Sequence, residues 1–154
     1  MIAEHEFVTT MPAKEAFEAV EASVEPLGFK RDAIGDLSSA DWVRGKKKPQ
    51  RNIFTKLPMK LRMGYDRGRV NLALAIDEPG KPQRLPHVYG LALLAGLETR
   101  IGHEPVASNG LAEAASIFDK ARRRERAHNI IAWTVLSLIL LSIFGLIVFA
   151  AMSA

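Results

Sequence analysis

The residue types that most often perform chemistry are sparse in this chain of 154 residues. There is no cysteine, which excludes a thiolate zinc site, an iron–sulfur cluster and a cysteine nucleophile. The four histidines, His5, His87, His103 and His128, are never three or four residues apart, so no helix face presents two of them to one metal ion. We interpret them as four separate side chains and expect no metal site.

Sequence motifs of common active sites are also absent. The chain contains no G-x-S-x-G nucleophile turn, no phosphate-binding P-loop and no G-x-G-x-x-G dinucleotide turn. Asp32, Asp36 and Asp41 are close in sequence, but paired carboxylates define acid–base chemistry only when a known fold positions them. We therefore expect no catalytic residue, no cofactor and no enzyme activity. An enzyme with an unfamiliar site at the membrane is the third interpretation.

Basic residues, in contrast, are concentrated in one part of the chain. Residues 30–69 carry twelve basic and four acidic residues, a net charge of +8, between acidic stretches on either side. Such a block faces either solvent or an anionic surface, which is lipid headgroups or an acidic protein. Nucleic acid is a less favoured partner, because the block has few aromatic residues and no nucleic-acid-binding motif. The candidate contact residues are Arg44, Lys46, Lys47, Lys48, Arg51, Lys56, Lys60 and Arg62.

Residues 130–151 have the composition that is typical of a membrane span. Residues 130–151 form an uncharged run of 22 residues, of which 14 are Leu, Ile, Val or Phe. A helix of that length is about 33 Å long, against about 30 Å for the hydrocarbon core of a bilayer. Inserting these side chains contributes on the order of −4 to −8 kcal/mol, which favours a membrane span over a buried core helix. The residues expected at the membrane surface are Arg122, Arg123, Arg124, Arg126 and Trp133.

The distribution of charge predicts the orientation of this span. Residues 120–126 carry five basic residues and one acidic residue, and no charged residue follows them. Since basic flanks stay in the cytoplasm, we expect a cytoplasmic N-terminal domain and a single crossing of the inner (plasma) membrane. The first ten residues contain neither a basic nor an apolar stretch, so they do not form a secretory signal. We expect a tail-anchored protein that inserts after its synthesis.

The residues before the span predict a small α+β domain with an antiparallel sheet and packed helices. Residues 59–65 and 70–77 alternate apolar and polar side chains, and the residues 66–68 between them suit a tight turn. Shorter strands are expected over residues 2–9 and 40–46. The residues of the hairpin that we expect to face the core are Met59, Leu61, Val70, Leu72, Leu74 and Ile76.

Helices are expected to pack on this sheet. Residues 13–27 and 87–101 place apolar side chains at steps of three and four residues, and Thr9 or Thr10 is expected to cap the first helix. The buried residues of that helix are expected to include Phe17, Val20 and Val24. We divide the chain into a soluble domain (residues 1–110), a basic juxtamembrane helix (111–129) and a transmembrane helix (130–151).

Together these patterns favour a non-enzymatic, single-pass membrane protein. Its soluble domain is interpreted as an interaction module, or as an accessory subunit of a larger membrane protein complex. The expected partners are membrane lipid and other membrane protein subunits, and nucleic acid is not expected. The alternative is a lipid- or ligand-binding domain that uses the basic block at the membrane surface.

Overall fold

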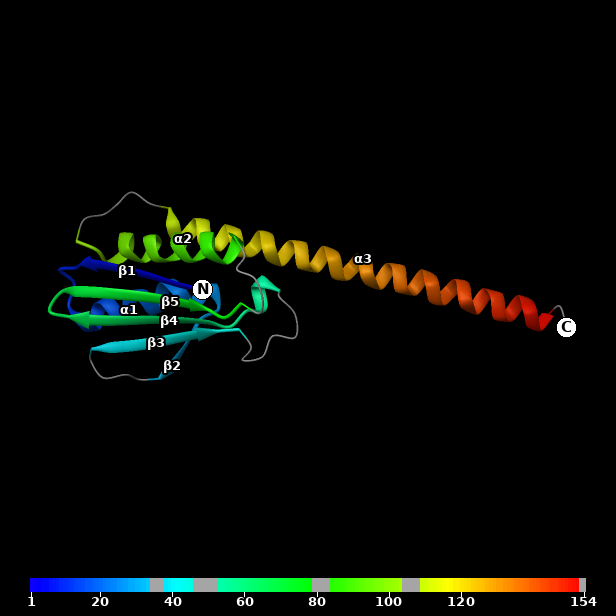
Figure 1. Ribbon diagram of the computed structural model, residues 1–154, viewed down its shortest axis with the longest axis horizontal. Coiled ribbons are helices and arrows are strands. Elements are labelled where there is room, and N and C mark those ends of the chain that lie inside the picture. The colour runs from blue at the N-terminus through cyan, green and yellow to red at the C-terminus, as the bar shows by residue number, and fades with distance from the viewer. Residues whose placement is uncertain (34–37, 46–52, 79–83, 104–108, 153–154) are drawn as a thin grey trace. The chain divides into compact units, whose positions relative to one another are not determined.

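The structure is a computed structural model that describes residues 1–33, 38–45, 53–78, 84–103 and 109–152. The chain forms two compact units, the domain unit (Met1–Asp119) and the tail unit (Lys120–Ala154). The domain unit contains a five-stranded sheet in the order β1-β5-β4-β3-β2, in which every neighbouring pair is antiparallel (Figure 1). The strands are β1 (Ile2–Val8), β2 (Lys30–Ala33), β3 (Ser39–Arg44), β4 (Met59–Asp66) and β5 (Arg69–Ile76). The α+β prediction is therefore confirmed.

The β4–β5 hairpin forms where the alternating pattern predicted it. Arg67 and Gly68 lie between the paired residues Asp66 and Arg69 and have φ angles of 47° and 85°. Two successive positive φ angles match the right-handed twist of the flanking strands, and glycine adopts one of them without a steric cost. The turn thus fixes the register that puts the large buried residues of both strands, such as Leu61, Leu72 and Leu74, on one face.

The helices of the domain unit also begin and end close to their predicted positions. α1 (Ala13–Val24) continues into a short 3-10 helix, η1 (Glu25–Leu27), and Gly28 ends it with a φ of 86°. α2 spans Arg84–Ile101, and a second 3-10 helix, η2, spans Phe54–Lys56. The last helix, α3 (Gly110–Met152), begins in the domain unit.

The predicted cap of α1 is wrong. The residue before the helix is Pro12, and its side chain makes no capping bond. Thr9 has another role, because its hydroxyl accepts a hydrogen bond from the N–H of Met11 at 3.0 Å and donates to the carbonyl of Ile101 at the end of α2.

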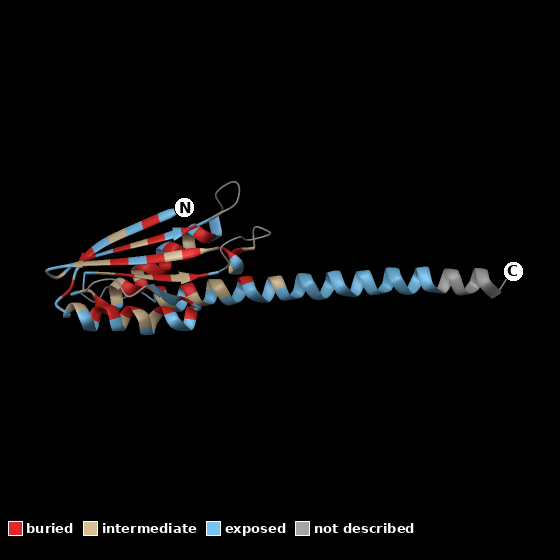
Figure 2. Cartoon of the chain, turned by 90° about the horizontal axis from the view of Figure 1, so that it is seen from below, coloured by how far each residue is buried: buried red, intermediate tan, exposed pale blue. Residues whose placement is uncertain are grey.

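One face of the sheet forms the core and the other is open. The alternation of buried and exposed residues along the strands is visible in Figure 2. Phe17 of α1 contacts Trp42 of β3, and Glu98 of α2 contacts His5 of β1, so both helices lie on the same face. The predicted core residues are all buried there: Met59, Leu61, Val70, Leu72, Leu74, Ile76, Phe17, Val20 and Val24.

Two glycines allow α2 and the first turn of α3 to meet. A Cβ on Gly110 would lie 2.9 Å from the Cα of Gly96, and a Cβ on Gly96 would lie 2.7 Å from Cγ of Leu111. Both distances are shorter than real side-chain contacts, so only glycine fits at these two positions. The start of α3 is therefore part of the domain unit.

Candidate functional site

The predicted basic block is only partly within the described residues. Lys46, Lys47, Lys48 and Arg51 lie outside them. Lys56 is exposed at the end of η2, and Lys60 and Arg62 lie on the open face of β4. Arg44, at the end of β3, is buried.

Arg44 lies on the face of the sheet opposite to Lys60 and Arg62. Arg44 pairs in register with Met59, and both side chains point toward the core, so only 7% of Arg44 is exposed. Lys60 pairs with Val43, on the open face. Because side chains alternate between the faces of a strand, the structure does not bring Arg44 together with the other two cations.

The guanidinium of Arg44 lies against three aromatic rings from separate parts of the chain. Its Cζ atom lies 3.5 Å from the ring centroid of Phe118, near the start of α3, and 5.7 Å from that of Phe29. Nη1 donates a hydrogen bond of 3.0 Å to the hydroxyl of Tyr89 in α2. Burial raises the pKa of this hydroxyl, and the nearby positive charge of Arg44 opposes that rise. Arg44 thus joins β3, α2 and the first turns of α3 in one cation–π cluster.

The two cations on the open face share one carboxylate. Asp41 of β3 accepts a hydrogen bond of 2.9 Å from Nε of Arg62, and Nζ of Lys60 lies 2.8 Å from its other oxygen. The hydrogen bond from Arg62 is the main reason that the pKa of Asp41 is lowered. Burial is the next largest effect and opposes it, and the hydrogen bond and charge of Lys60 lower the pKa further. The three side chains carry a net charge of +1 instead of +2, which weakens this part of the basic block as an anion-binding surface.

This cluster predicts a loss of stability in acid. A carboxylate with a lowered pKa in the folded state stabilises the fold above its ordinary pKa of 3.8, and the contribution disappears as the pH falls below that value. We expect the difference in unfolding free energy between the wild type and Asp41→Asn to be constant from about pH 7 to pH 5 and to shrink below about pH 4. Urea unfolding of the full chain in neutral detergent micelles measures it. In an Arg62→Gln, Lys60→Gln background the Asp41→Asn change should have almost no effect, and a wild-type difference that persists at about pH 2.5 would contradict the assignment.

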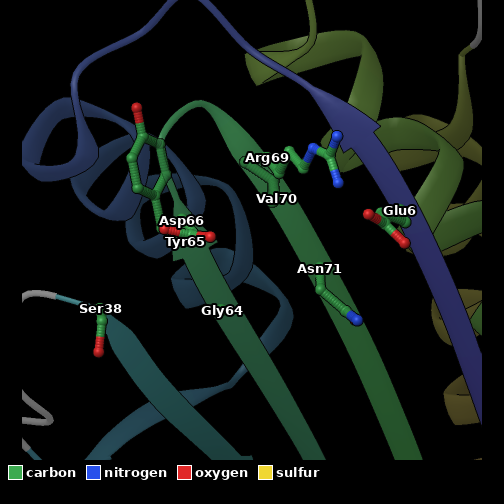
Figure 3. Close-up of a pocket in the computed structure, with 8 residues that line it drawn as sticks. All are labelled: Glu6, Ser38, Gly64, Tyr65, Asp66, Arg69, Val70 and Asn71. Atoms are coloured by element: carbon green, nitrogen blue, oxygen red, sulfur yellow. The ribbon is translucent and has the colours of Figure 1, made fainter.

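Two shallow hollows lie on the open face, at opposite ends of the hairpin. The first, of about 400 Å³, lies near the turn, and Figure 3 shows the side chain of Arg69 extending from β5 toward β1, which carries Glu6. The second, of about 250 Å³, lies at the other end and is lined by apolar groups of Val43, Pro58 and Met59 beside Lys60. Both hollows are open to solvent.

Among the described residues, no group of three or more His, Asp or Glu side chains could hold a metal ion. His5 is bound to a carboxylate within the fold, since its Nε2 lies 2.7 Å from Oε2 of Glu98. The contact joins the edge strand β1 to α2 and stands beside the ring of Phe7. His5 is therefore a structural residue of the core face.

The tail unit contains the rest of α3, which is one helix as far as Met152. Arg122, Arg123, Arg124 and Arg126 are exposed on it, and so are Trp133 and the apolar residues from Ile130 to Phe144. An apolar surface on all sides of a helix suits lipid and not water. The helix is long and apolar enough to cross a membrane.

The chain therefore combines a two-layer α+β domain with one helix that could span a bilayer. A scan against protein-family models finds no match, and a search of curated protein sequences finds none either.

Proposed function

We propose that the protein is a non-enzymatic, tail-anchored interaction module of the inner membrane, with the domain unit in the cytoplasm. The observation that supports this proposal best is the helix α3, which begins packed against α2 at Gly110 and continues through four arginines into an apolar stretch. Helix α3 contains residues of both the domain unit and the tail unit. The membrane anchor would therefore keep a partner that binds the domain at the membrane surface, as expected of an accessory subunit.

Topology is the first expected result. With the basic residues 120–126 on the domain side of the span, the domain should stay in the cytoplasm while the other end of the span crosses the membrane. A reporter active only in the cytoplasm should work when fused to the N-terminus, and one active only outside should work at the C-terminus. Changing Arg122, Arg123, Arg124 and Arg126 to glutamine should reduce this bias. Cytoplasmic activity of the C-terminal reporter in the wild type would refute the proposed orientation.

A stable partner is the second expected result. An accessory subunit extracted in a mild detergent should elute with another membrane protein in a fixed ratio, at a mass above that of the chain in its micelle. The matched control is the chain with its residues 1–119 replaced by an unrelated soluble domain of similar size on the same tail. Elution of the wild type alone at every detergent tested, or the same partner with the control, would contradict a role for the domain unit.

A second candidate function is contact between the basic block and anionic lipid. Arg44 precedes residues 46–52 and Phe54 follows them, and both contact the ring of Phe118. A domain attached to the membrane by its own chain samples the surface at a high effective concentration, so even a weak attraction of the lysines at 46–48 to the headgroups would suffice.

A further inference from the structure

β1 is an edge strand, and on the side away from β5 some of its backbone N–H and C=O groups point outward from the sheet. Met1 donates to the carbonyl of Ile76 and accepts from its N–H, each at 2.8 Å, and the N–H of Thr9 donates to Gly68. The register between β1 and β5 is regular between these points. Since successive residues of a strand direct their backbone groups to opposite sides, the odd-numbered residues bond to β5. Ile2, Glu4 and Glu6 direct theirs outward.

The open edge of β1 ends at Val8. At one end the carbonyl of Val8 accepts a hydrogen bond of 2.9 Å from the N–H of His103, so that position is closed. In the described part of the chain, no hydrogen bond reaches the backbone groups of Ile2, Glu4 or Glu6. A strand laid beside them would gain a bond to each of these donors and acceptors.

The opposite edge of the sheet is not an equivalent site. β2 has only four residues, and its register to β3 shifts between Arg31 and Ala33. An irregular register interrupts regular pairing, which is one way in which proteins protect edge strands from other chains. β1 has seven residues and no bulge, so it is the edge that can accept a further strand.

The side chains beside the open backbone groups are acidic. Glu4 and Glu6 are exposed on the open face, and none of the ion pairs of the described residues includes either of them. Their paired residues on β5 are the uncharged Ala73 and Asn71, and the side chain of Arg69 extends toward β1 near Glu6 (Figure 3). A second copy of β1 would bring acids beside acids, which disfavours pairing between copies. A basic strand would bring lysine or arginine beside each carboxylate.

We propose that the β1 edge binds an extended basic segment of a partner protein, which adds a strand beside Ile2, Glu4 and Glu6. The segment would have lysine or arginine at every second position, on the side of the open face. This inference rests on the proposed function, because it names how the interaction module holds its partner. Backbone bonds would give the affinity and the two carboxylates the preference for a basic sequence.

The direct test uses the isotope-labelled full chain in neutral detergent micelles and a short peptide of alternating threonine and lysine, blocked at both ends. The amide signals of Ile2, Glu4 and Glu6 should shift in a saturable way, while those of Ala3 and His5, already bonded to β5, should shift much less. The same peptide with every backbone nitrogen methylated keeps its charge and loses its donors. Its binding should be roughly tenfold weaker or worse. Equal binding of both peptides, or no binding of the first, would overturn the proposal.

Variants at Glu4 separate backbone pairing from charge. Glu4→Pro removes an N–H that points outward, so it costs no bond to β5, but it blocks the added strand and should weaken peptide binding roughly tenfold. Glu4→Gln should weaken it less, and Glu15→Gln, an exposed acid on α1, should leave it unchanged. An unchanged thermal midpoint would show that Glu4→Pro is folded; if it is not, the methylated peptide still decides. If the peptide does not bind but the topology and the partner ratio are as expected, the proposal of strand addition at the β1 edge is refuted. The proposed membrane-anchored interaction module is then unaffected.

Discussion

Replacing Leu72 by alanine is expected to lower the free energy of unfolding by about 2–5 kcal/mol. Leu72 is completely buried in the middle of β5, with His5 paired to it on one side and Met63 on the other. The strands on both sides hold the backbone in place, so neighbouring groups cannot move in to fill the space. The loss therefore includes both the transfer of the side chain and the cavity left behind.

Urea unfolding of the full chain in neutral detergent micelles measures this loss. Both chains should carry Trp133→Phe, so that the fluorescence reports only the buried Trp42 of the domain unit. The matched control is Asn71→Ala, one residue away on the open face, which should change stability by less than about 0.5 kcal/mol. Similar losses for the two variants would mean that the faces of β5 are assigned incorrectly.

Reversal of Lys46, Lys47 and Lys48 to glutamate is expected to abolish binding to anionic membranes if the basic block contacts lipid. At about 1 kcal/mol per basic residue, three attractions become three repulsions, a change of about 6 kcal/mol at most. Salt reduces it, because the Debye length is only about 8 Å at physiological ionic strength. The effect should therefore be larger in dilute buffer.

Flotation of residues 1–119, the complete domain unit, with liposomes provides the measurement. Vesicles with and without phosphatidylserine or phosphatidylglycerol are compared at low and at physiological salt. The matched control reverses Lys14, Arg67 and Arg69, three exposed cations that change the net charge equally. Arg67 and Arg69 lie at the hairpin turn, the end of the hairpin away from Phe54, and the bond from Tyr65 to Met11 brings the start of α1 there too. If the wild type and the Lys46–Lys48 variant float equally under all four conditions, the lipid contact is wrong and an acidic protein is the functional partner of the block.

Local pattern was enough to predict most elements of the domain. In β4 and β5 each apolar residue is separated by one polar or small residue, and the turn between them contains the glycine that its geometry needs. The stripe Phe17, Val20 and Val24 likewise fixed which face of α1 is buried. Where burial and backbone geometry depend on residues a few positions apart, the local sequence pattern predicts the secondary structure and the buried face.

For Arg44, charge alone did not predict the position of the side chain, which is buried. Because Arg44 is charged, we grouped it with the lysines that follow it in sequence. In β3, however, it lies on the same face as Ala40 and Trp42, which are both buried. That alternation was a usable signal for a core-facing side chain. Its aromatic neighbours could not be predicted, because Phe29, Tyr89 and Phe118 come from parts of the chain far apart in sequence.

Strand β2 and the candidate edge were beyond local pattern for a different reason. Lys30, Arg31 and Asp32 have no apolar alternation, since an edge strand with one neighbour needs little burial. Glu4 and Glu6 have meaning only once β1 is known to lie at the edge, next to β5. Strand order is a property of the whole chain, and no short window contains it.

The same strand order sets a delay during synthesis. β1 is translated first, but its only partner in the sheet is β5, between 61 and 73 residues later along the chain. At about 5–20 residues per second, a ribosome needs roughly 3–15 s to make the residues in between. Throughout that interval β1 has both edges free and Phe7 uncovered, while β4 and β5 can close as a hairpin within microseconds of their release. The first strand to leave the ribosome is thus the last to join the sheet, and a chaperone that recognises short extended segments would find its binding site there.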